Sequence, residues 1–142
     1  MAGPHPAPGR QADITYFTGT DFYDLAIWAA SGERASDRWL REEGLWTADR
    51  DWVSEVCSLA DRDNISGFDP RWRVAYTDTE RQQCRTDGVT PVDLAATHAG
   101  TDEFLEEMWL AVRHVARLLY THARLSGSQV RAVASQYLTG SR

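Results

Sequence analysis

The stretch that decides the fold is Thr101–Leu125, which has the sequence TDEFLEEMWLAVRHVARLLYTHARL. Its apolar residues recur every three or four positions, which is the spacing of one face of an α-helix. The members of that face are Phe104, Met108, Ala111, Val112, Val115, Leu118, Leu119 and His122. A helix that is apolar over so much of its circumference is normally covered by other helices. The stretch therefore predicts a long central helix over about residues 102–125.

The flanking segments are also predicted to be helical, because caps and helix-breaking residues divide them at short intervals. Expected helices begin near Thr20 or Asp21, at Glu33, at Thr47, at Asp69–Pro70, at Thr90–Pro91 and near Ser128. Expected stops are Ser31–Gly32, Gly44, Gly88 and Gly100. Alternation typical of strands is nearly absent. The predicted fold class is all-α, an irregular bundle of six to seven helices around the long one. Residues 1–12 are predicted to be a disordered tail, and residues 13–142 a single helical domain.

The chain has 142 residues and a net charge of −6, and 42% of its residues are hydrophobic. This is the length of one domain, with enough apolar content for a core. All 15 basic residues are arginine, which excludes lysine chemistry such as a Schiff base. No apolar run approaches the ~20 residues of a membrane span, and no secretory signal follows the start. The composition therefore predicts a cytoplasmic protein with no membrane association.

Charge is unevenly distributed along the chain. The segment from Met108 to Arg142 contains five arginines and no acidic residue. On the long helix, arginines and flanking aromatic residues form a stripe beside the apolar face, and protein interfaces favour this composition. The predicted partner-binding residues are Trp109, Arg113, Arg117, Tyr120 and Arg124. The alternative is that this stripe pairs with acidic helices of the same molecule.

These features predict a small acidic, non-catalytic protein that binds a protein partner and so forms a heteromer. Two kinds of protein fit this description: an accessory subunit of a biosynthetic enzyme, and an immunity-type or antitoxin-type protein. Arginine-rich composition is typical of GC-rich genomes, which directs the first possibility toward specialised-metabolite biosynthesis. The alternative function is a small helical enzyme or small-molecule binder, whose aromatic-lined pocket would use His122 and an arginine.

Two residues of the long helix, Arg117 and His122, form the pattern Arg-x4-His. This pattern resembles the terminal-helix motif of HEPN-type ribonucleases, which are also small helical bundles. The resemblance covers these two residues and implies that both act on a scissile phosphate. They are the candidate catalytic residues. His114, by contrast, is predicted to be an ordinary surface histidine.

The sequence contains no complete metal-binding or cofactor-binding motif. A run beginning at Asp61 and Asp63 has Ile65 and Trp72 where a calcium loop needs oxygen ligands. Zinc spacings and glycine-rich phosphate loops do not occur. Cys57 and Cys84 are interpreted as small apolar fillers, with their redox state left open. The sequence predicts no metal and no cofactor, and its acidic balance argues against nucleic acid as a partner.

Overall fold

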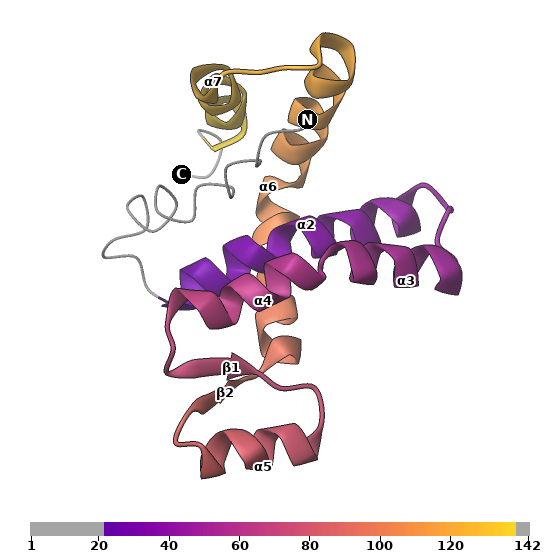
Figure 1. Cartoon of the computed structure of the whole chain (residues 1–142). Helices are drawn as coiled ribbons and strands as arrows, with labels where there is room; N and C mark the ends of the chain where they lie inside the picture. The colour runs from indigo at the N-terminus through magenta and orange to yellow at the C-terminus, as the bar shows by residue number, and fades with distance from the viewer. Residues whose placement is uncertain (1–21, 139–142) are drawn as a thin grey trace, which may run out of the picture. The chain divides into compact units, whose positions relative to one another are not determined.

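The computed structural model describes residues 22–138, and 78% of them are helical. The predicted tail over residues 1–12 therefore lies outside the described residues. The elements are α2 (Phe22–Glu42), α3 (Ala48–Cys57), α4 (Leu59–Phe68), β1 (Trp72–Val74), α5 (Asp78–Thr86), β2 (Thr90–Val92), α6 (Leu94–His122) and α7 (Gly127–Leu138) (Figure 1). A single residue, Ser58, separates α3 from α4. If α3 and α4 are counted together as one helix, the described residues contain five helices, instead of the six to seven predicted.

Contacts within the chain divide it after Thr101 into two units, and α6 contributes to both. The first unit contains α2 to β2 and the first turns of α6, and the second contains the rest of α6 together with α7. Each unit is described by itself.

Helix α2 continues through Ser31 and Gly32, where the sequence predicts a break. The hydroxyl of Ser31 donates to the carbonyl oxygen of Ile27, so it does not compete for backbone partners outside the helix. The buried face of α2 also continues past this point, and its members are Leu25, Ala26, Ala29, Ala30, Glu33 and Asp37. Tertiary burial therefore overrides the weak local preference of serine and glycine.

The predicted boundary between the next two helices is confirmed. Gly44 follows α2 with a φ of 67°, a left-handed conformation that glycine adopts without steric cost. Thr47 then caps α3, and its side chain accepts a hydrogen bond from the backbone N–H of Arg50. As a result α3 and α4 run back alongside α2 (Figure 1).

The largest correction concerns the helices predicted from Asp69–Pro70 and Thr90–Pro91. Trp72–Val74 and Thr90–Val92 instead pair as two short parallel strands, with Trp72 opposite Thr90 and Val74 opposite Val92. Asp69 does not cap a helix, because its carboxylate binds the backbone and guanidinium of Arg71. The strands bring apolar side chains onto the core formed by Ile65, Ala26, Ala29 and Val92. The pairing is non-local, which is why periodicity within each segment did not reveal it.

Between the strands, α5 begins where a capping box forms. The side chain of Thr77 accepts from the backbone N–H of Glu80, and the carboxylate of Glu80 accepts from the backbone N–H of Thr77. It also accepts from the N–H of Tyr76 at 2.7 Å. These backbone hydrogen bonds, from Tyr76 and then from Thr77, hold the pKa of the Glu80 carboxyl below its usual value.

Helix α6 begins at Leu94 and ends at His122, earlier at both ends than predicted. The carboxylate of Asp93 accepts from the N–H of Ala96 at the start, and Ala123 terminates the helix with a φ of 61°. Gly100, predicted as a stop, lies inside α6, where a β-carbon would collide with the hydroxyl of Tyr23 on α2. Glycine here permits the close approach of two helices. The last predicted helix is confirmed as α7.

Candidate functional site

The predicted partner-binding stripe on α6 is only partly exposed. Trp109 is 6% exposed and therefore does not belong to an outward-facing surface, which corrects the prediction for this residue. Arg113 is half-buried, Arg117 and Arg124 are exposed, and Tyr120 is 95% exposed. The apolar face is also less covered than expected, because Phe104 and Leu119 are exposed. Leu105 and Ala111 are buried.

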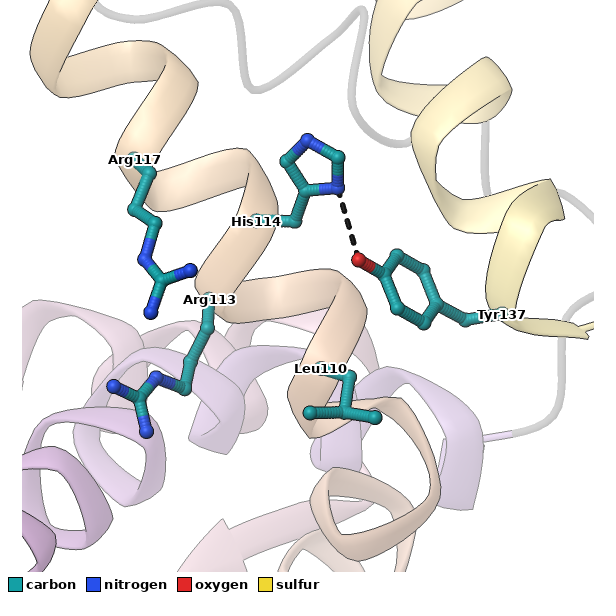
Figure 2. A pocket seen from close by; sticks show the side chains of 5 residues that line it. All are labelled: Leu110, Arg113, His114, Arg117 and Tyr137. Carbon is teal, nitrogen blue, oxygen red and sulfur yellow. Dashed lines mark hydrogen bonds between the residues drawn. The ribbon is translucent and has the colours of Figure 1, made fainter.

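A cavity of about 310 Å³ lies between α6 and α7, within the second unit. Four of its lining residues come from α6 and one from α7: Leu110, Arg113, His114, Arg117 and Tyr137 (Figure 2). At about 100° per residue, the four α6 residues span about 100° of the helix surface. In Figure 2 the two guanidinium groups extend to one side of α6, and the imidazole and phenol meet on the other.

His114 and Tyr137 are joined across this cavity. Nδ1 of His114 and the hydroxyl of Tyr137 are hydrogen-bonded at 3.0 Å, and the two rings meet edge to face at a centroid distance of 6.0 Å. Because the bond joins α6 to α7 between half-buried groups, it fixes both rings. If the phenol donates to Nδ1, the opposite nitrogen Nε2 carries a proton and is a donor. The sequence analysis missed this pair, since its members are 23 positions apart.

The two candidate catalytic residues are not brought together. Arg117 lines the α6–α7 cavity, whereas His122 is exposed in the last turn of α6 and is not among the lining residues. Five positions of helix correspond to a rotation of about 140°, so the two side chains leave α6 on different sides. The His122-based pocket that the sequence offered as an alternative does not form at this cavity.

A buried cluster of charged side chains lies in the first unit, around Arg62 of α4. Its guanidinium forms a two-point ion pair with the carboxylate of Glu33 on α2, with Nε of Arg62 2.9 Å from Oε2 of Glu33. It also contacts Glu55 at 3.1 Å and lies over the ring of Tyr76. Nε2 of His98 lies 3.7 Å from the same Glu33 carboxylate. The hydrogen bonds to Glu33 raise the pKa of the Arg62 guanidinium above its already high value.

Helix α3 exposes an apolar face. None of its residues is buried. Trp52 is 63% exposed and Val53 is 52% exposed, and Val56 shares their side of the helix and is also exposed. Beyond Ser58, Leu59 continues this uncovered apolar surface on α4. We call Trp52, Val53, Val56 and Leu59 the α3 face.

Comparisons of the chain with protein-family models, with curated proteins and with solved structures found no match. In the part of the chain that the structure describes, no helix is long and apolar enough to cross a membrane. Residues 22–138 also contain no group of three or more His, Cys, Asp or Glu placed to hold a metal ion.

Proposed function

We propose that the protein is a non-catalytic binding module whose α3 face docks a protein partner. The observation that carries the proposal is an entire helix with an apolar side and no buried residue. Leaving a tryptophan and two valines of one helix in water forgoes several kcal/mol of burial, at roughly 1.5–3 kcal/mol for each side chain. Contiguous apolar surface of this kind marks interaction sites in globular proteins.

The charges around the α3 face indicate the chemistry of the partner. Asp49 precedes the face, and Asp61 and Asp63 follow it; all three are exposed. Glu55, on α3 itself, is also more than half exposed. An apolar strip with acidic neighbours is complementary to an amphipathic helix whose apolar side is flanked by Lys or Arg. We therefore expect the partner to contribute a basic amphipathic helix, and the affinity to fall as salt concentration rises.

This proposal places the partner on a different surface from the α6 stripe, and the two are separable by mutation. Trp52→Ala removes the largest side chain of the α3 face, and Tyr120→Ala removes an exposed aromatic from α6. Because both side chains are exposed, each substitution should change the free energy of unfolding by about 0.5 kcal/mol or less. The pair is therefore matched in chemistry and in expected stability.

The test is gel filtration and calorimetry of the full chain with the purified products of the adjacent genes, one at a time. A tryptophan at the centre of an interface typically contributes 2 kcal/mol or more, so Trp52→Ala should weaken the complex about 30-fold or more. Tyr120→Ala should leave it unchanged. The proposal fails if no neighbour binds, or if Tyr120→Ala abolishes the complex and Trp52→Ala does not.

Two protein classes operate by such binding: accessory subunits of biosynthetic enzymes, and immunity-type or antitoxin-type proteins. Both follow from the sequence as proposals, and the identity of the bound neighbour would separate them. A second copy of this chain is the competing occupant of the α3 face. Light scattering that shows a concentration-dependent dimer, converted to monomer by Trp52→Ala, would favour that occupant over a different protein.

A further inference from the structure

One exposed side of α6 carries opposite charges toward its two ends. Glu103 and Glu107 lie on the N-terminal half of this side, Arg117 lies on the C-terminal half, and Leu110 lies between them. All four are exposed, Leu110 to 66%. At about 100° per residue, their side chains leave the helix within about 80° of one another, so they share one face. All belong to the second unit. We call Glu103, Glu107, Leu110 and Arg117 the α6 charge face.

The helix dipole does not account for this arrangement of charge. Acidic side chains stabilise the first turn of a helix and basic ones the last turn, and the effect fades beyond those turns. Because α6 begins at Leu94, its first turn contains no acidic residue, and Glu103 and Glu107 lie in its interior. Arg117 also precedes the last turn, whose basic residue is His122. The charges of this face therefore do not serve the ends of the helix.

The acidic half of the face is unfavourable to an isolated helix. Glu103 and Glu107 are four positions apart, so their carboxylates are neighbours, and like charges at this spacing destabilise a helix. A guanidinium placed beside both carboxylates offsets this repulsion, since its planar fork donates several hydrogen bonds to carboxylate oxygens. Glu106 and Arg113 already have interactions within the chain, and they are not part of the α6 charge face.

The pattern of the α6 charge face is complementary to itself. When two copies of α6 lie antiparallel, the acidic half of each meets the basic half of the other. A two-fold axis near Val112 places Arg117 of one copy opposite Glu107 of the other, because each lies about 7.5 Å from the axis along the helix. Glu103 follows one turn beyond Glu107, and Leu110 lies close to the axis. A two-fold interface requires this kind of self-complementary surface.

We propose that the protein forms a dimer in which the α6 charge faces of two copies pack antiparallel. Arg117 of each copy binds Glu103 and Glu107 of the other, and the two Leu110 side chains pack at the centre. Tyr120, which is 95% exposed, borders the face and covers its edge. Arginine and tyrosine are among the residues that contribute most to protein interfaces. The contact leaves the α3 face open and does not depend on the proposal for that face.

The charge of the whole chain is not an obstacle at this contact. The net charge is −6, but residues 102–142 contain four acidic residues and five arginines, so the second unit is close to neutral. One helix packed against its copy is a small interface, of the class that forms weak and reversible complexes. Because its ion pairs lie at the surface, the dimer should dissociate as salt concentration rises.

The experiment is sedimentation velocity of the full chain at low and high salt, over a concentration series that extends to the high-micromolar range. The wild-type chain should form a reversible dimer at low salt. Arg117→Glu should weaken the dimer about tenfold or more, because it turns four attractive contacts, two on each side of the axis, into repulsive ones. Glu103→Arg combined with Glu107→Arg should weaken it similarly. A mixture of these two variants should form a dimer again, since their charge patterns are complementary to each other.

Arg131→Glu is the matched control, because Arg131 is an exposed arginine of α7, in the same unit and outside the α6 charge face. It makes the same change of charge and should leave the dimer unchanged, and circular dichroism checks that each variant keeps its helices. The proposal is overturned if the wild-type chain stays monomeric at low salt, if Arg117→Glu and Arg131→Glu have equal effects, or if the mixture does not associate. A dimer that Trp52→Ala dissociates uses the α3 face instead and also overturns the proposal.

Discussion

Replacing Arg62 with alanine should destabilise the protein far more than replacing a surface arginine. The guanidinium of Arg62 is buried, with two bonds to the buried carboxylate of Glu33 and one to Glu55. Arg62→Ala removes the cation and leaves the buried Glu33 carboxylate without its guanidinium partner. Breaking a buried ion pair on one side typically costs 3–5 kcal/mol, because the remaining charge stays out of water.

The matched control is Arg71→Ala. Arg71 forms a comparable two-point pair with Asp69, but its side chain is 83% exposed. Water replaces the lost partner there, so the expected cost is below about 1 kcal/mol. For a chain of this size, we expect the midpoint of thermal unfolding to fall by about 10–15 °C for Arg62→Ala and by about 3 °C or less for Arg71→Ala.

Thermal unfolding followed by circular dichroism, together with urea denaturation, measures both effects. The double variant Arg62→Met with Glu33→Leu tests the cause, because it removes both charges and keeps much of the buried volume. It should recover much of the stability lost in Arg62→Ala. Equal losses for Arg62→Ala and Arg71→Ala, or a double variant no more stable than Arg62→Ala, would refute the argument from a buried carboxylate without its guanidinium partner.

Two further predictions concern local structure. Because the folded-state pKa of Glu80 is depressed, the cap of α5 contributes stability above the unfolded-state pKa and loses it as pH falls through the folded-state value. Glu80→Gln should therefore weaken the pH dependence of stability in the acid range; an unchanged pH profile by urea denaturation would contradict this. Gly100→Ala should destabilise the wild-type chain, because its β-carbon meets the hydroxyl of Tyr23. In a Tyr23→Phe background the cost should be smaller by about 1 kcal/mol, and a double-mutant cycle with no coupling would contradict the predicted contact.

Predictions from local signals were correct at the boundary between α2 and α3, where short-range geometry decides the outcome. Gly44 ends α2 and Thr47 begins α3, since a left-handed φ and a capping side chain act within a few residues. The long apolar periodicity around Trp109 correctly identifies a long helix, although α6 begins at Leu94. The α6–α7 cavity was not predicted from the sequence, because no sequence motif connects His114 with Tyr137.

What the sequence determined by itself is the mostly helical character, the position of the longest helix and the excess of arginine after Met108. Each follows from spacing or charge that is readable within a few turns. Only tertiary structure decided that Trp72–Val74 pairs with Thr90–Val92, that Arg62 meets Glu33 29 positions away, and that the α3 face is exposed while Trp109 is buried. Pairing and burial depend on which distant segments come together, and a pattern within one segment does not encode its neighbours.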